Sequence, residues 1–313
     1  MSSLPDTMPT PGALAAVRTR AYRGAASYSA LAYLFSAPAF ILLALTTVVP
    51  IILVLLASLT NYSLGSISFD YIGLDNYGRL LGDRYFWNAL RNSALYALMT
   101  VPLSVGLALV LATILNDRVR SRRFYEIVYF LPITSTLTAM SIVWSYLLNG
   151  HIGPLAQAMS WLGLPRLDFF SDGNLALIGL ALIGIWHQLG FNLVLFLAGF
   201  TVISKELNEA SALDGVHSLW DRLRFIIWPL LAPTTLVVLV LNCIGAFQAF
   251  DTVAVLTNGG PYGSTDMLLY KINIDTFEGM KAGYGSAMTV VYLVIIVLFS
   301  ILQVAYSNRK AAR

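Results

Sequence analysis

The residues of this chain that could bind a small molecule are amides and aromatic rings set inside long apolar stretches. Gln188 and Asn192 are four positions apart, so a helix places them on one face, with Trp186 offset from them. Amides hydrogen-bond hydroxyl groups, and an aromatic face can cover the apolar side of a sugar ring. This chemistry suits a neutral, polyhydroxylated solute. The candidate residues for a solute pathway are Trp186, Gln188, Asn192, Asn242, Gln248, Asp251 and Tyr292.

These polar residues also have a structural explanation. Polar groups in a membrane usually face a bundle interior or a pathway, and hydrogen bonding between helices is the commoner use of any one of them. Asp251 could be an interfacial carboxylate, and His187 a packing residue. No series of Asp, Glu and His crosses the apolar stretches, which disfavours a proton relay but leaves sodium coupling open.

The sequence contains no catalytic or metal-binding motif. It lacks the signatures of serine hydrolases, zinc proteases and phosphate loops. The nearest lookalike, residues 259–265, has no lysine to reach a phosphate and is interpreted as a turn. The single cysteine, Cys243, and three scattered histidines offer no metal-ligand spacing. We therefore predict a non-enzymatic chain with no cofactor, in which any ATP is bound by another subunit.

Composition identifies an integral membrane protein. Of the 313 residues, 58% are hydrophobic and 11% charged, with a mean hydropathy of +0.73, whereas soluble domains carry about 25% charged residues. Six apolar segments are long enough to cross the bilayer as helices. We expect an all-α polytopic bundle of six transmembrane helices. The segments are 30–59, 90–115, 125–148, 175–202, 226–249 and 285–306.

The basic residues predict the orientation. Thirteen of the nineteen Lys and Arg residues lie in the N-terminal tail, the second and fourth connections and the C-terminus. Because positive charge accumulates on the cytoplasmic side, both termini are predicted to be cytoplasmic. Residues 1–27 form a disordered cytoplasmic tail by composition, and residues 28–313 form one transmembrane domain whose fourth connection spans about 203–227.

That fourth connection is polar and has the capping signals of a short helix at both ends. Ser204 is a favourable N-cap, Glu206 lies in the first turn, and Gly215 stands where a C-terminal cap belongs. Residues 210–212 form a surface with little side-chain bulk, so another protein's backbone could approach closely. An ordinary loop helix between two spans is the alternative.

Three stretches together resemble the permease subunits of bacterial ABC importers, in particular the carbohydrate-uptake group that includes the maltose and glycerol-3-phosphate permeases. Residues 209–215, Glu-Ala-Ser-Ala-Leu-Asp-Gly, are similar to the EAA loop of that family. Residues 250–261 resemble its outer-loop signature, and residues 69–77 its first outer loop. The resemblance covers nearly the whole chain after the tail.

The resemblance implies an assembly in a bacterial cytoplasmic (inner) membrane. A second homologous permease would complete a heterodimer, a dimer of ATPase subunits would bind ATP and Mg, and an external solute-binding protein would deliver the solute. The EAA segment would be a cytoplasmic coupling helix seated in the ATPase, and the outer loop would face the binding protein. The implied coupling residues are Glu206, Glu209, Ala210, Ser211, Ala212, Asp214 and Gly215, and the implied outer-loop residues are Asn258, Gly259, Gly260 and Pro261.

The chain departs from the family pattern at three places in this segment. Ser211 replaces an alanine, Val216 stands where alanine is usual, and the interval from Gly215 to Pro229 is one residue longer than usual. The longer interval changes the expected register of the residues after Gly215 against the ATPase.

Two alternatives concern the solute and the energy source. A permease for glycerol-3-phosphate, a glycerophosphodiester or a sulfonated glycoside is possible within the same family, but no Lys or Arg lies well inside a predicted span to meet an anion. An ion-coupled secondary transporter would need internal repeats or broken helices in matching halves, and the sequence indicates neither. Nothing in the sequence indicates binding of nucleic acid.

Overall fold

The computed structural model describes residues 33–116, 122–203 and 218–311, and the chain divides into two compact units, Met1–Leu56 and Ala57–Arg313. In the first unit the described residues belong to the apolar helix Tyr33–Ala57, which contains the π-helical turn η1 (Ala44–Val48) and α2 (Val49–Ala57).

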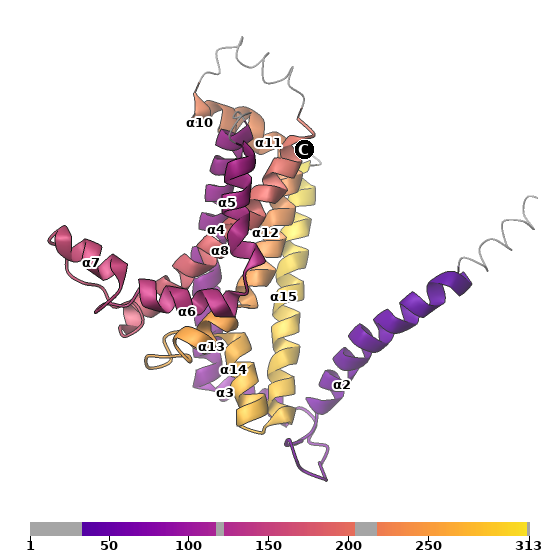
Figure 1. Cartoon of the computed structure of the whole chain (residues 1–313). Coiled ribbons are helices and arrows are strands. Elements are labelled where there is room, and N and C mark those ends of the chain that lie inside the picture. Colours follow the sequence, from indigo (N-terminus) through magenta and orange to yellow (C-terminus); the bar gives the residue numbers. More distant parts are fainter. Residues whose placement is uncertain (1–32, 117–121, 204–217, 312–313) are drawn as a thin grey trace, which may run out of the picture. The chain divides into compact units, whose positions relative to one another are not determined.

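The second unit is a bundle of long helices with short helices at its ends (Figure 1). Helix α4 packs along α8, α12 packs against α4, α8 and α15, and α5 packs against α8. The long helices are α4 (Arg84–Asn116), α8 (Gly173–Phe200), α12 (Ala232–Phe247) and α15 (Ala282–Ala311). The shorter helices are α3 (Asp75–Gly82), α5 (Arg122–Thr134), α6 (Leu137–Leu147), α7 (Pro154–Trp161), α10 (Leu219–Arg222), η2 (Leu223–Ile227), α11 (Trp228–Leu230), α13 (Asp251–Leu256), α14 (Leu268–Asn273) and η3 (Ile274–Glu278).

Five helices in the described part of the chain are long and apolar enough to cross a membrane, which agrees with the predicted all-α membrane fold. The count of six is not reproduced, because the predicted third span, 125–148, is divided into α5 and α6 at Ser135–Thr136. Pro132 removes one backbone donor just before the break. The Thr134 hydroxyl donates to the carbonyl of Leu131 instead of leaving that group to the helix ladder.

Glycines allow the long helices to approach closely. A Cβ built on Gly190 of α8 would lie 1.8 Å from the carbonyl oxygen of Tyr129 in α5. A Cβ on Gly184 would lie 2.2 Å from the hydroxyl oxygen of Tyr96 in α4. Small residues at such crossings permit backbone contact in lipid, where water drives no hydrophobic association between helices. These two glycines therefore set how α4 and α5 sit on α8.

The connection before α3 is fixed by hydrogen bonds at the end of the bundle that carries α3 and α14, called here the α14 end. The buried amide of Asn76 donates to the carbonyls of Ser58 and Thr60, at 2.9 and 2.8 Å. The amide of Gly283 donates to the carbonyl of Tyr62 at 2.7 Å. The connection that precedes α3 is thereby attached to the first turn of α15.

We predict that Gly190→Ala lowers the melting temperature of the purified protein in lipid nanodiscs, because the new methyl group displaces the backbone of α5. Overpacking of this kind costs about 1–3 kcal/mol. Gly106→Ala is the matched control, since Gly106 lies in α4 with nothing within 4 Å of its built Cβ. Equal melting temperatures for the two variants would contradict the packing of α5 on α8.

Candidate functional site

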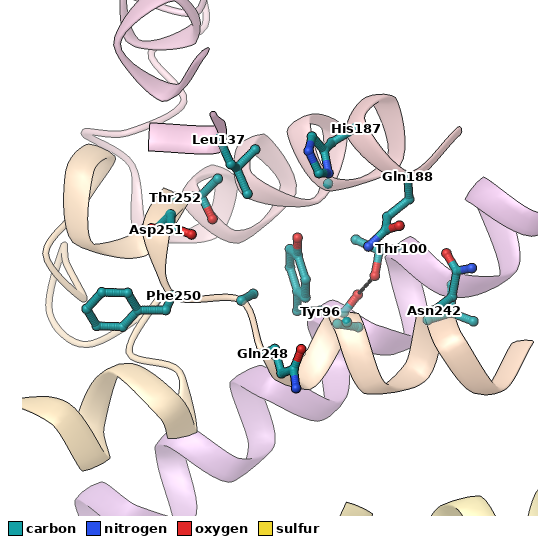
Figure 2. Close-up of a pocket in the computed structure, with 15 residues that line it drawn as sticks. Tyr96, Thr100, Leu137, His187, Gln188, Asn242, Gln248, Phe250, Asp251 and Thr252 are labelled. Atoms are coloured by element: carbon teal, nitrogen blue, oxygen red, sulfur yellow. Dashed lines mark hydrogen bonds between the residues drawn. The ribbon is translucent and has the colours of Figure 1, made fainter. Parts of the chain in front are cut away.

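A cavity of about 220 Å³ lies between α4, α8, α12 and α13, and polar side chains line it (Figure 2). Each of these elements contributes side chains that can donate or accept a hydrogen bond. Leu137, from the start of α6, and Phe250, from the connection after α12, add apolar surface. The polar lining residues are Tyr96, Thr100, His187, Gln188, Asn242, Gln248, Asp251 and Thr252.

Two short helices meet at this cavity. Helix α12 ends at Phe247, and the chain turns at residues 248–250 before α13 begins. Helix α6, which follows the break after α5, packs against α13. The Thr138 hydroxyl of α6 donates to the Asp251 carboxylate of α13 at 3.2 Å. The cavity lining therefore includes the starts of both short helices, each of which follows a break in the chain's helical path.

Several polar groups in the lining have unused hydrogen-bonding capacity. The side-chain amides of Gln188 and Gln248 make no hydrogen bond within the described residues. The Thr252 hydroxyl is buried, with the residue 1% exposed, and has no partner in the described structure. Thr100 differs, because its hydroxyl donates to the carbonyl of Tyr96 at 2.8 Å. Buried polar groups are normally paired, so these free groups are available to a bound polar molecule or to water.

A buried amide pair lies beside the cavity. Asn192 of α8 and Asn242 of α12 exchange reciprocal hydrogen bonds, one of them 3.0 Å long. Ser104 of α4 donates to the same Asn242 oxygen at 3.2 Å, and the second Asn242 amide hydrogen reaches the carbonyl of Val238. All three side chains that form this network are buried. The network joins three helices of the bundle at one point.

The structure brings four of the seven predicted pathway residues together at the cavity: Gln188, Asn242, Gln248 and Asp251. Asn192 lies behind the lining and pairs with Asn242. Trp186 packs edge-to-face on Trp144, with ring centroids 5.4 Å apart. Tyr292 belongs to a separate apolar cluster with Phe86, Leu268 and Met288, where its hydroxyl has no partner among the described residues.

The four polar lining residues that were not predicted as pathway residues are Tyr96, Thr100, His187 and Thr252. Tyr96 and Thr100 have the same four-residue spacing as Gln188 and Asn192, so the signal was present. Thr252 could not be found from spacing, because its position depends on the turn at 248–250.

The predicted outer loop, residues 258–261, is tightly folded at the α14 end. Asn258 has a φ of 49° and Gly259 a φ of 80°, both in the left-handed region. The Thr265 hydroxyl donates to the carbonyl of Gly260 at 2.6 Å. The Asn92 amide of α4 donates to the carbonyls of Gly263 and Asp266, at 2.9 and 3.0 Å. The loop is thereby held against the start of α4.

A group of ionisable side chains follows this loop. Burial raises the pKa of Asp266 to about 6, although the Lys271 ammonium opposes the rise; Asp275 and Asp83 add to it. Lys271 is paired instead with Asp275, at 2.6 Å between Nζ and Oδ2. Burial also acts to raise the pKa of Asp83, but the hydrogen bond from the Tyr284 hydroxyl and two backbone amides lower it below its usual value.

The predicted coupling residues lie outside the described residues, since 204–217 are not described. This applies to Glu206, Glu209, Ala210, Ser211, Ala212, Asp214 and Gly215. Among the residues that are described, no group of three or more His, Cys, Asp or Glu side chains could hold a metal ion.

The family model and the similar proteins all indicate the same family. Residues 104–311 match the model of the binding-protein-dependent transport system inner membrane component family. The chain is 31% identical to the sn-glycerol-3-phosphate transport system permease protein UgpA of Agrobacterium fabrum (strain C58), over 90% of this chain and 95% of the relative. It is 32% identical to the lactose transport system permease protein LacF of Rhizobium radiobacter, over 88% of this chain and 93% of the relative.

A solved structure shares the fold. A chain of a bacterial ABC transporter involved in the import of the acidic polysaccharide alginate superposes with a TM-score of 0.79 at 20% identity. The match covers 93% of this chain and 99% of the other.

We predict that Asn192→Leu and Asn242→Leu each lower the free energy of unfolding by about 1–3 kcal/mol. Asn242→Leu leaves the buried Asn192 amide without its partner, whereas Asn192→Leu leaves Asn242 only its bonds to Ser104 and Val238. The double variant removes both polar groups, so its loss should be smaller than the sum of the two single losses. Thermal unfolding of the purified protein in nanodiscs measures all four forms. Additive losses would show that the two amides do not act as a pair.

We predict that Asp266→Asn raises the melting temperature at pH 8 by about 2–4 °C. The folded-state pKa of Asp266 lies above the ordinary value of 3.8 for an aspartate, so ionisation destabilises the folded state. This loss of stability develops as the pH rises from about 4 to about 6. The gain from the substitution should therefore be smaller at pH 5 than at pH 8. An unchanged or lower melting temperature at pH 8 would show that Lys271 offsets the cost of burying the ionised Asp266 carboxylate.

Proposed function

This chain belongs to the family of binding-protein-dependent transport system inner membrane components, and from that membership we propose that it is the permease subunit of an ATP-driven importer for a sugar or a sugar-like solute. The observation that supports the solute class most is the chemistry of the cavity. Its lining offers the free amides of Gln188 and Gln248 and the hydroxyls of Tyr96 and Thr252, with no Lys or Arg. Such groups bind hydroxyls without requiring a charge on the solute.

Glycerol-3-phosphate is the second candidate, and the 31% identity to a permease of that solute favours it. A phosphate group would meet the Asp251 carboxylate and no cation from the lining of this cavity. The second permease or the binding protein would then have to supply the positive charge. We therefore place the neutral solute first.

The proposed partners are a second homologous permease, a dimer of ATPase subunits that binds ATP and Mg, and an external solute-binding protein. The chain would cross the bacterial cytoplasmic membrane several times with both termini in the cytoplasm. Residues Asn258–Pro261 would face the binding protein. Residues 204–217 would face the ATPase, with Glu209 in its cleft and the small side chains of residues 210–212 allowing close docking.

The proposed mechanism is a shift between two conformations of the bundle. ATP binding would close the ATPase dimer and move the coupling segment, and the helices would respond as rigid bodies. The breaks at 135–136 and 248–250 separate α6 from α5 and α13 from α12. We propose that these two short helices part to admit the solute and meet again to close the cavity.

The test is ATP hydrolysis and solute uptake by the complex formed with the products of neighbouring genes, reconstituted in liposomes. The binding protein is loaded either with neutral sugars or with sn-glycerol 3-phosphate. Stimulation by one neutral sugar is expected, whereas stimulation by the phosphate alone would overturn the solute assignment. ATP-independent uptake driven by an ion gradient would overturn the importer assignment.

Variants in the same assay test the two proposed sites. Gln188→Leu should lower the uptake rate at limiting solute about 3- to 10-fold, because the variant loses one or two hydrogen bonds to the solute. Gln157→Leu in α7, away from the cavity, is the control. Glu209→Ala should abolish solute-stimulated ATP hydrolysis and uptake together. Full activity of Gln188→Leu or of Glu209→Ala would remove that residue from its proposed role.

A further inference from the structure

The connection between α6 and α8 contains an uncharged, apolar excursion. Residues 152–165 include no Asp, Glu, Lys or Arg, and His151 and Arg166 bracket them. Helix α7 occupies the first part of this segment, and Gly163, with a φ of 69°, turns the chain after it.

The large apolar side chains of this excursion are exposed. Trp161 is 87% exposed and Leu162 75% exposed, although Ala156 of the same helix is buried. We call the exposed set the α7 face; it consists of Ile152, Leu155, Trp161, Leu162 and Leu164. Large apolar side chains exposed together on a short segment are uncommon on a surface that faces water and mark contact with a protein or a membrane.

The base of the excursion is firmly attached to the bundle. The Asn149 side-chain oxygen accepts hydrogen bonds from the amides of His151 and Ile152, at 2.9 and 3.0 Å. A Cβ on Gly150 would lie 2.5 Å from the Cβ of Asp168, so the two ends of the excursion touch. Leu148 and Phe169 then pack with Ile183 of α8. The position of α7 is therefore set by packing at its base.

Helix α7 itself stands out to the side of the bundle beyond α6 (Figure 1). It has no extensive contact with another helix in the part of the chain that is described. The helices on either side of the excursion also expose apolar side chains. Ile142 of α6 is 62% exposed, and Ile178 and Leu182 of α8 are 41% and 42% exposed. Exposed apolar side chains thus lie on both helices that flank the excursion.

We propose that α7 and the turn after it are an interfacial anchor, with the α7 face inserted into the boundary between acyl chains and lipid headgroups. Three observations select lipid over a protein partner. The segment is uncharged, the helices that flank it also expose apolar side chains, and Arg166 follows it directly. Trp is favoured at this boundary, and the Arg166 guanidinium at its edge can bind lipid phosphate. The anchor would fix the depth of α6 in the membrane.

The test uses the single cysteine of the chain. In a Cys243→Ser background, nitroxide labels are placed at Leu162→Cys and Leu164→Cys in the full-length protein, purified with its co-purifying subunits in nanodiscs. Accessibility to oxygen and to a water-soluble nickel chelate is measured by EPR. Tyr262→Cys, in the loop before α14, is the control, since Tyr262 is fully exposed.

The proposal predicts high oxygen and low nickel accessibility at both α7 positions, and high nickel accessibility at the control. Low accessibility to both reagents would show that a protein subunit covers the α7 face, and high nickel accessibility would show that water does; either result overturns the proposal. If labelled variants fail to assemble, the tryptophan fluorescence is measured in brominated lipids. These lipids should quench a larger fraction of the fluorescence in the native protein than in Trp161→Phe. Equal fractional quenching would also overturn it. None of these measurements depends on the solute or on ATP.

Discussion

The structure depends most on the buried hydrogen-bond network of Asn192, Asn242 and Ser104. It is the point at which α8, α12 and α4 are joined by directional contacts rather than by apolar packing alone. A shift of one helix by a residue would leave buried amides unpaired, which is costly for buried polar groups. Gln188 lies one helical turn before Asn192, so the same network fixes where the Gln188 amide lies in the cavity.

The second constraint is the placement of helix breaks. The helical path of the chain is interrupted at 135–136, between α5 and α6, and at 248–250, between α12 and α13, and both breaks lie close to the cavity. An interrupted helix frees backbone groups, and a membrane protein tolerates this only where protein or water can satisfy them. The contact of Thr138 with Asp251 connects the two segments that follow the breaks. Polar chemistry and interrupted backbone thus occur at the same place.

Much of this could be predicted from the sequence, and the exceptions have physical causes. The length of the apolar segments was enough to locate five spans, because a helix that crosses the bilayer must be apolar over the thickness of the hydrocarbon core. The third predicted span is divided between α5 and α6 because Pro132 and the hydroxyls after it act locally, and a hydropathy pattern does not place the resulting break. The four-residue spacing correctly put Gln188 and Asn192 on one helix, yet only tertiary packing could pair Asn192 with Asn242. The sequence allowed Trp186 to face the cavity, but in the structure its ring packs against the ring of Trp144 instead.

The charge of the lining limits which subunit can select the solute. Asp251 has Thr138 as its hydrogen-bond partner, and the described lining supplies no cation to it. Two like charges 4 Å apart repel by about 4 kcal/mol at an effective dielectric of 20. An anionic solute would therefore be disfavoured beside Asp251 by several orders of magnitude unless another subunit brought a Lys or Arg into the pathway. It follows that, if this protein imports an anion, discrimination by charge would have to come from the proposed partner permease or binding protein, whereas this chain would contribute hydrogen bonds to hydroxyl groups.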